Sequence, residues 1–309
     1  MRRLSIVVVT RNSSRYLERC LETVADRGDE IVVVDNASDD GSPELVRRRF
    51  PAVRVVELDH NLGYGPANNV GFKATASEHI LVLNPDAWPL GFAIERLLEA
   101  ADAFPRAALV GARLVRPDGS QEASARGFPT VWRLATEYLF LRWLAPWTTS
   151  LNAFYGAGAD SRAPGEVEWV VGAALLVRRE AVDEVGGFDP SFFMYDEEVD
   201  LAYRLRTRGW TVVYQPLATF VHVGGGSTNL HRFELYREQL RSHLRFLDKH
   251  YGRASAERAR QVIRTAMQLR GLVLRGERRR VSRDAAQWLA EHEVGALLAG
   301  EKEGSIARP

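Results

Sequence analysis

Short apolar runs alternate with helical patterns along the first third of the chain. Four runs predict strands, namely residues 4–9, 30–34, 53–58 and 79–83. The first two are continuous in Val and Ile, which is typical of strands buried on both faces of a parallel sheet. Residues 14–26, 43–50 and 67–75 have helical spacing between these runs. This alternation predicts an α/β fold with a doubly wound, mainly parallel sheet flanked by helices.

The rest of the chain has a less even pattern. Asp118-Gly119 predicts a hairpin turn after a strand over 112–116. Further on, the pattern predicts strands over 169–177 and 211–214, helices over 179–185 and 197–208, and a helix end at Gly209. From about residue 233 the chain is helical and basic, and it ends in a frayed tail after residue 300. We therefore expect one domain over 1–228 and a basic helical extension over 229–309.

Two segments in the middle of the chain are open to more than one interpretation. Residues 131–147 are rich in apolar and aromatic side chains. They fit a helix packed on the core, a helix that lies in a bilayer interface, or a contact in a homodimer. Residues 148–166 are rich in Ser, Gly, Ala and Pro and predict a loop.

Composition excludes several classes of protein. Hydrophobic residues make up 46% and charged residues 26% of 309 residues, as in ordinary globular proteins and unlike fibrous or largely disordered chains. Cys20 is the single cysteine, which excludes a disulfide framework and a multi-cysteine metal site. The N-terminal apolar run is too short for a secretory signal, and we expect a cytoplasmic protein without a membrane-spanning helix.

The net charge of +1 conceals an uneven distribution. Residues 1–228 carry 24 Lys/Arg against 30 Asp/Glu, and residues 229–309 carry 17 against 10. A near-neutral total argues against nucleic-acid binding. The basic extension is either a solvated helical face or a surface for an anionic partner, such as the phospholipid headgroups of a membrane.

Polar side chains follow three of the predicted strands. They occupy residues 10–12, 35–42 and 84–86. Ligands of doubly wound sheets bind beyond the carboxyl ends of the strands, so these loops predict a site. Asp86 could hold Mg²⁺ or Mn²⁺ together with substrate phosphates, and Asp35 could hold a base or sugar edge. The chain has neither GxxxxGK[ST] nor an early GxGxxG, so we expect metal to neutralise a nucleoside diphosphate.

An ordered set of motifs over residues 4–228 resembles the inverting glycosyltransferases of family 2, which have the GT-A fold. The matching segments are SIVVVTRN (5–12), IVVVDNASDDGS (31–42), NLGYGPANNVG (61–71), LVLNPDA (81–87), GAALLVRR (172–179), VGGFDPSFFMYDEEVDLAYRLRTRGW (185–210) and HVGGGS (222–227). The resemblance implies a mixed sheet, a donor half over about 1–110 and an acceptor half over about 111–228.

The resemblance also implies residues that bind the nucleotide-sugar donor and its metal. Asp86 ends the family's DXD metal motif, whose first Asp is Asn84 here, and His222 occupies the position that helps to hold metal or diphosphate. The donor-binding residues that it implies are Thr10, Asn12, Asp35, Asn36, Asn61, Gly63, Asn68, Asn84, Asp86 and Ser227.

The acidic cluster at residues 196–200 predicts the catalytic base. Crowded carboxylates raise one another's pKa, which suits a general base, although acidic residues also favour the start of a helix. The family has Glu-Asp here, and Glu197 and Glu198 fill these positions. We therefore expect Glu198 to be the base, while Glu197 or Asp200 orients the base or holds the acceptor.

The resemblance further extends to the rhamnosyltransferase-like members of the family, through residues 117–121 and 126–129. It implies transfer of L-rhamnose from dTDP-L-rhamnose to a glycan or polyprenyl-diphosphate-linked acceptor, at the inner face of the plasma membrane, in cell-surface polysaccharide synthesis. The alternatives are a UDP- or GDP-sugar donor, and a non-catalytic subunit that binds a nucleotide sugar. A nicotinamide-dependent oxidoreductase and a glycoside hydrolase fit less well, because GxGxxG is absent and because adjacent carboxylates on one helix seldom flank a bond.

Overall fold

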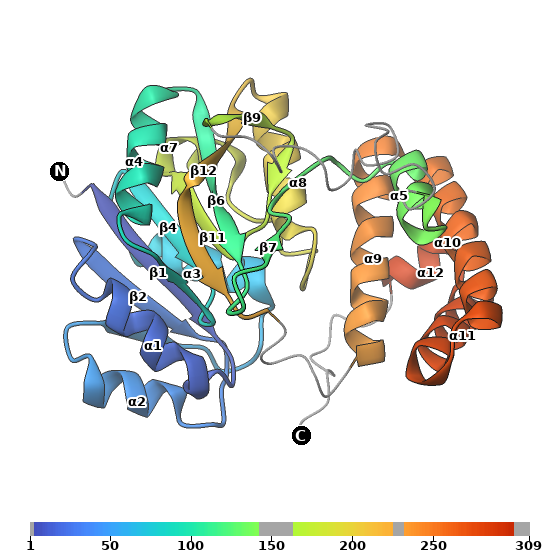
Figure 1. The fold of residues 1–309 in the computed structure, drawn as a ribbon, viewed down its shortest axis with the longest axis horizontal. Helices are drawn as coiled ribbons and strands as arrows, with labels where there is room; N and C mark the ends of the chain where they lie inside the picture. Colours follow the sequence, from blue (N-terminus) through green and yellow to red (C-terminus); the bar gives the residue numbers. More distant parts are fainter. Residues whose placement is uncertain (1–2, 142–162, 225–231, 300–309) are drawn as a thin grey trace. The chain divides into compact units, whose positions relative to one another are not determined.

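The computed structural model describes residues 3–141, 163–224 and 232–299. They belong to two compact units, an α/β unit and a helical unit (Figure 1). The α/β unit comprises residues 1–126, 157–193 and 197–227. The helical unit comprises residues 127–156, 194–196 and 228–309, so it draws on two segments that precede the basic extension.

The α/β unit is built on a mixed sheet, with a second, two-stranded sheet beside it. Within the described residues, the strands are β1 (Leu4–Thr10), β2 (Glu30–Asp35), β3 (Arg54–Glu57), β4 (His79–Leu83), β5 (Ala87–Pro89), β6 (Ala107–Val115), β7 (Gln121–Glu122), β8 (Ala125–Arg126), β9 (Gly165–Val167), β10 (Trp169–Val170), β11 (Ala174–Arg178) and β12 (Thr211–His222). The main sheet has the order β3-β2-β1-β4-β11-β6-β12-β5.

Along this order, four of the seven neighbouring pairs are parallel, as expected for a mixed, mainly parallel sheet. Strands β3, β2, β1 and β4 run parallel to one another, and β6 runs parallel to β12. Strand β11 lies antiparallel between β4 and β6 and joins the two parallel groups. The carboxyl ends of β1, β2 and β4 therefore open on one edge of the sheet.

Helices cover both faces of this sheet. They are α1 (Ser14–Val24), α2 (Ser42–Arg49), α3 (Tyr64–Lys73), α4 (Ala93–Ala103), α7 (Arg179–Val185) and α8 (Glu197–Thr207). Helices α1, α2 and α4 share one apolar core with Ile6 and Val8 of β1. Helix α3 lies against Val7 instead, on the opposite face, because neighbouring side chains of a strand alternate.

Several elements differ from the prediction. Strand β6 begins at Ala107 rather than at residue 112, and β9 begins within the loop expected over 148–166. The expected strand over 169–177 is two strands, since β10 pairs with β8 while β11 enters the main sheet. The strand expected over 211–214 continues to His222, past irregular pairing between Gln215 and Thr219. Helix α4 was not predicted, although Ile94 and Leu97 have helical spacing and are buried.

The helical unit has its own apolar core. Its helices are α5 (Val131–Tyr138), α9 (Arg232–Tyr251), α10 (Arg253–Val273), α11 (Gly276–Glu291) and α12 (Val294–Ala299). Leu134 and Tyr138 of α5 pack with the buried side chains of the other four helices. The helix predicted over 131–147 is thus the short helix α5. Residues 142–147 of the predicted segment lie outside the described residues. In the described part of the chain, no helix is both long and apolar enough to span a membrane.

Gly71 allows α3 to approach β1 closely. A Cβ atom at this position would lie 2.3 Å from Val7 Cγ1. Gly71→Ala should therefore lower the free energy of unfolding by about 1–3 kcal/mol, the usual cost of overpacking a core, although alanine has the higher helix propensity. Urea denaturation measures this change.

Two further variants control for this prediction. Gly165→Ala should be nearly neutral, because nothing lies within 4 Å of a Cβ atom there. Adding Val7→Ala to Gly71→Ala should make the loss smaller than the sum of the two single changes. Equal stability of the Gly71→Ala and Gly165→Ala proteins would show that α3 does not approach β1 as closely as described.

Candidate active site

Two buried polar side chains lie at the carboxyl ends of β1 and β2. Thr10 and Asp35 are register partners in the parallel pair and are 0% and 3% exposed. Thr10 Oγ1 and Asp35 Oδ1 have no hydrogen-bond partner among the described residues. Burial raises the pKa of Asp35, although Ser38 donates to its other oxygen at 2.9 Å. Because buried polar atoms normally have partners, this edge of the sheet is suited to a ligand that supplies hydrogen bonds.

Hydrogen bonds tie the loop after β1 to the loop after β2. Asn12 N donates to Ser38 Oγ at 3.0 Å, and Asp39 N donates to Asn12 Oδ1 at 2.9 Å. Asp40 accepts from Ser14 N at 2.8 Å. Burial raises the pKa of Asp40, but the hydrogen bonds from Ser42 and Ser14 outweigh this effect and lower it. The two loops thus form one rigid rim beside Thr10 and Asp35.

Asn36 holds the next loop. Its side chain donates to Asn61 Oδ1 at 2.8 Å and to Gly63 O at 3.2 Å, and it accepts from Leu62 N at 2.8 Å. Gly63 has φ +88°, and a Cβ atom there would lie 2.2 Å from Phe193 O, so only glycine fits. The predicted donor-binding residues Asn36, Asn61 and Gly63 therefore shape the rim through contacts with one another.

Tyr64 lies among the predicted site residues, although the sequence analysis did not select it. Its hydroxyl donates to Gly172 O at 3.2 Å, and its carbonyl accepts from Asn68 Nδ2 at 3.0 Å. Burial raises the pKa of Tyr64 well above its usual range, and the negative charges of Glu197, Glu198 and Asp86 add to the shift. The acidic cluster and the Asn84-Pro85-Asp86 loop thus converge on one phenol.

Asn68 is the remaining predicted residue on α3. It is 0% exposed, and its Oδ1 has no hydrogen-bond partner among the described residues. Together with Thr10 and Asp35, it adds a third acceptor that the described fold leaves unsatisfied.

Asp86 and His222, which the resemblance implies for a metal site, lie side by side. His222 Nε2 is 3.6 Å from Asp86 Oδ1 and 3.3 Å from Asn84 Nδ2. Asp86 Oδ2 accepts from Gly224 N at 3.1 Å. Strand β12 carries His222 to this place, because it pairs with β5 directly after the loop.

Glu122 supports His222 from the other side and was missed by the sequence analysis. Its Oε2 lies 2.9 Å from His222 Nδ1. Burial lowers the pKa of His222, but the hydrogen bond to Glu122 and the charges of Asp86 and Glu122 outweigh burial and raise it. Burial raises the pKa of Glu122 in turn, but the hydrogen bond and the charge of His222 outweigh burial and lower it. The carboxylate therefore holds the ring so that Nε2 faces Asp86.

These donors suit Mg²⁺ or Mn²⁺, although they are few. Asp86 contributes a carboxylate oxygen and His222 an imidazole nitrogen, both acceptable to such ions. In the described residues, no group of three or more His, Cys, Asp or Glu side chains could hold a metal ion. A cation here would thus take its other ligands from substrate phosphates and water.

The acidic residues of α8 have different surroundings. Gly172 N donates to Glu198 Oε1 at 3.4 Å, and Glu197 is 5% exposed. Asp200 is 0% exposed and pairs with Arg204 at 2.7 Å, while Arg204 also donates to Val185 O. Asp200 is thus enclosed and bound to Arg204, and its expected part in holding the acceptor or orienting the base stays a prediction.

The segment just before α8 folds with the helical unit. Ser242 Oγ donates to Met194 O at 2.9 Å, and His243 Nδ1 lies 2.5 Å from Asp196 Oδ2. Tyr195 and Asp196 both have positive φ, which is uncommon for residues other than glycine. The basic extension therefore holds a strained turn that leads into the acidic helix.

Of the predicted residues, only Ser227 lies outside the described residues. The signal for Tyr64 was present, since it belongs to the NLGYGPANN motif. The sequence carries no comparable signal for Glu122, because its partner His222 is 100 residues away.

Comparison with known proteins identifies the family. The model of Glycosyl transferase family 2 matches residues 5–186, and that of Glycosyl transferase family group 2 matches residues 125–276. An N-acetylglucosaminyl-diphospho-decaprenol L-rhamnosyltransferase of Mycobacterium tuberculosis is 37% identical over 244 residues. That match covers 73% of this chain and 77% of the relative.

Two solved structures resemble the fold. GalNAc-T7, solved with UDP, GalNAc and Mn²⁺, aligns with a TM-score of 0.58 at 16% identity, over 97% of this chain and 58% of its own. The mannosyltransferase PcManGT from Pyrobaculum calidifontis, solved with GDP-Man and Mn²⁺, aligns with a TM-score of 0.55 at 18% identity, over 97% of this chain and 81% of its own. The predicted fold and family are thus confirmed, and the chain belongs to glycosyltransferase family 2.

Proposed function

We propose that this protein is an inverting rhamnosyltransferase. It transfers L-rhamnose from dTDP-L-rhamnose to a hydroxyl group of a glycan carried on a polyprenyl diphosphate, in the synthesis of cell-surface polysaccharide. The observation that carries the proposal is the placement at one sheet edge of the Asp86–His222 pair, whose side chains are 3.6 Å apart, and of the unsatisfied Thr10 Oγ1 and Asp35 Oδ1. The choice of sugar and acceptor is supported by the name of the relative that is 37% identical.

The nucleoside of the donor binds at the ends of β1 and β2. Thr10 Oγ1 and Asp35 Oδ1 offer unsatisfied acceptors there, and Asn68 Oδ1 offers a third. Asn12 and Asn36 keep the surrounding loops in place. Preformed hydrogen-bonding groups at a rigid rim bind a ligand with little loss of conformational entropy.

Asp86 and His222 hold Mg²⁺ or Mn²⁺, and Glu122 fixes the imidazole. When bound, the cation offsets the charge that develops on the leaving diphosphate. Asn84, which replaces the first carboxylate of the motif, has its Nδ2 3.3 Å from His222 Nε2 and would release this nitrogen when the cation binds. The Gly224 N–H group, which already donates to Asp86 Oδ2, keeps that carboxylate in place.

Glu198 removes the proton from the acceptor hydroxyl. The acceptor oxygen then forms a bond to the anomeric carbon while the bond from that carbon to the diphosphate breaks, so dTDP leaves and the configuration inverts. The hydrogen bond from Gly172 N orients the Glu198 carboxylate. Glu197 lies on the same first turn of α8 and keeps the base region negatively charged, which suits proton uptake.

We further propose that the protein acts in the cytoplasm, at the inner face of the plasma membrane. An acceptor linked to a polyprenyl diphosphate is held in the membrane, so the enzyme must act at the membrane surface. The excess of basic residues in 229–309 favours contact with anionic lipid. Self-association through residues 131–147 stays a prediction.

Nucleotide sugars should stabilise the protein selectively. A ligand that binds only the folded state raises the melting temperature by mass action. We expect dTDP-L-rhamnose to raise it in the presence of Mg²⁺ or Mn²⁺, and to raise it less when a chelator is added. A larger shift with UDP- or GDP-sugars would discard rhamnose, and no shift with any donor would favour a non-catalytic subunit.

Replacing the base should abolish transfer without abolishing donor binding. Glu198→Gln should lower the turnover number about 10²–10⁴-fold, the range for loss of a general base. Thermal stabilisation by dTDP-L-rhamnose should remain, since Glu198 acts on the acceptor. Glu180→Gln, the same change at an exposed position of α7, is the control and should leave turnover unchanged. Near-normal turnover of the Glu198→Gln protein would disprove the assignment.

Glu122 should matter through His222. Glu122→Gln should lower activity by about 10–100-fold, as is usual when the partner of a metal-binding histidine is lost, and should raise the Mg²⁺ or Mn²⁺ concentration needed for half-maximal activity. Glu166→Gln, at an exposed position of strand β9, is the matched control. An unchanged metal requirement in the Glu122→Gln protein would argue against this role.

A further inference from the structure

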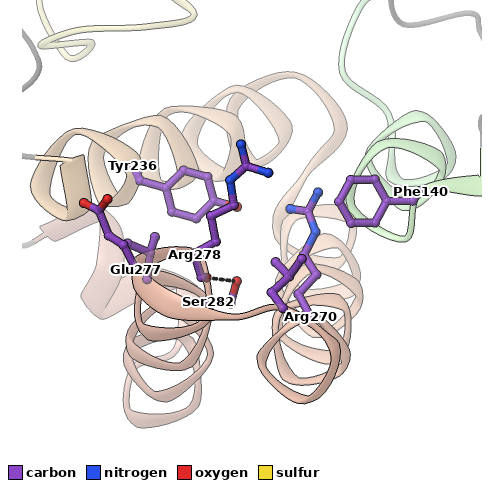
Figure 2. A pocket seen from close by; sticks show the side chains of 8 residues that line it. Phe140, Tyr236, Arg270, Glu277, Arg278 and Ser282 are labelled. Carbon is purple, nitrogen blue, oxygen red and sulfur yellow. Dashed lines mark hydrogen bonds between the residues drawn. The ribbon is translucent and has the colours of Figure 1, made fainter.

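The helical unit contains a pocket that the proposed reaction does not use. It lies where α10 turns into α11 and has a volume of about 440 Å³. Figure 2 shows the side chains that line it, namely Phe140, Tyr236, Arg270, Leu274, Glu277, Arg278, Val281 and Ser282. The wall combines two aromatic rings, aliphatic side chains and two guanidinium groups, so it suits a ligand with an anionic group and an apolar body.

The two arginines leave cationic groups free for such a ligand. In Figure 2 both guanidinium groups point toward the space between the rings of Tyr236 and Phe140. Arg270 Nε is buried and has no hydrogen-bond partner in the described part of the chain, and the Arg270 guanidinium lies 3.8 Å from the centre of the Phe140 ring. Neither Arg270 nor Arg278 forms an ion pair with another described residue. A buried cationic donor without an acceptor is costly, and a bound phosphate would remove this cost.

Helix α11 adds to the positive potential at the pocket. It begins at Gly276, and its N-cap residue Arg275 makes no side-chain capping hydrogen bond. The N–H groups of its first turn, which include those of Glu277 and Arg278, carry the positive end of the helix dipole. Glu277 is the one acidic side chain in the lining, against two arginines.

Apolar side chains are exposed beside the pocket. Leu269, Leu272 and Val273, in the last turn and a half of α10, are 50%, 73% and 80% exposed. Residues 269–283 also contain six arginines and one acidic residue. Exposed aliphatic side chains among arginines are typical of a surface that enters the headgroup region of a membrane. Nucleic acid would instead favour exposed aromatic rings for stacking on bases.

We propose that the α10–α11 turn is a binding site for an anionic membrane lipid. The lipid phosphate binds Arg270 and Arg278 in the pocket. The first methylene groups of the lipid acyl chains contact Leu274 and Val281. Leu272 and Val273 enter the apolar layer of the membrane. This proposal specifies how the protein makes the membrane contact of the proposed function. It rests on that function only for the biological purpose of the lipid site. The site would keep the enzyme beside a lipid-linked acceptor.

Flotation with vesicles tests the proposal on the full chain. We expect binding to vesicles of phosphatidylcholine mixed with an equal amount of phosphatidylglycerol, and little binding to phosphatidylcholine alone. Arg278→Gln should weaken binding about fivefold, as expected for one arginine at an anionic surface. Arg258→Gln removes the same charge at an exposed position earlier on α10 and should leave binding nearly unchanged.

A second pair of variants tests the apolar contact without changing charge. The double variant Leu272→Ser with Val273→Ser should weaken binding at least about tenfold, since both side chains would leave lipid. Leu217→Ser, at a residue of β12 that is 58% exposed, is the control and should have no effect. All four proteins should keep the melting temperature and its shift with dTDP-L-rhamnose, so failure of lipid binding is distinguishable from failure of donor binding.

Three outcomes would overturn the proposal. The first is absence of binding to the anionic vesicles, and the second is equal binding to phosphatidylcholine alone. The third is an equal loss of binding in the Arg278→Gln and Arg258→Gln proteins, which would show that only the total charge of the extension matters.

Discussion

The parallel arrangement of β1, β2 and β4 is the constraint on which the candidate site depends. These strands are buried on both faces, so their polar residues lie mostly at or near the strand ends. Because the strands run in one direction, their polar ends meet at one edge of the sheet. Thr10, Asp35 and the Asn84-Pro85-Asp86 loop therefore come together although they are far apart in the chain.

The rim of this edge is held by side chains rather than by regular secondary structure. Asn36 supplies both donor and acceptor groups to the loop that contains Gly63, and Asp40 accepts from the start of α1. These hydrogen bonds satisfy backbone groups that no strand or helix can satisfy. They leave a different set of polar atoms, on Thr10, Asp35 and Asn68, for the ligand.

The donor side and the base side of the proposed site depend on different parts of the chain. The donor side belongs wholly to the α/β unit, whereas the segment that precedes the acidic helix is held by Ser242 and His243 of α9. The basic extension thus has a structural role in addition to any contact with lipid. A chain that lacked α9 would lose the partners of Met194 and Asp196, and the turn with positive φ at Tyr195 and Asp196 would lose its support.

The amino-acid sequence predicted the strands and helices of the first half of the fold, its family, and the residues proposed for the donor side of the site. Buried β-strands leave continuous apolar runs, and polar loops at their ends are local signals that survive in the sequence. The close pairing of Asp86 with His222 was also predictable, but only through the resemblance to a family.

Only the tertiary structure shows the surroundings of residues whose partners lie far along the chain. Glu122 contacts His222 only because β12 brings the two together, and Asp200 is enclosed beside Arg204 in the core. The split of residues 169–177 into β10 and β11 likewise depends on which sheet each half joins. The pocket between α10 and α11 has no sequence motif, because it arises from the packing of helices whose spacing indicates only that one face of each is buried.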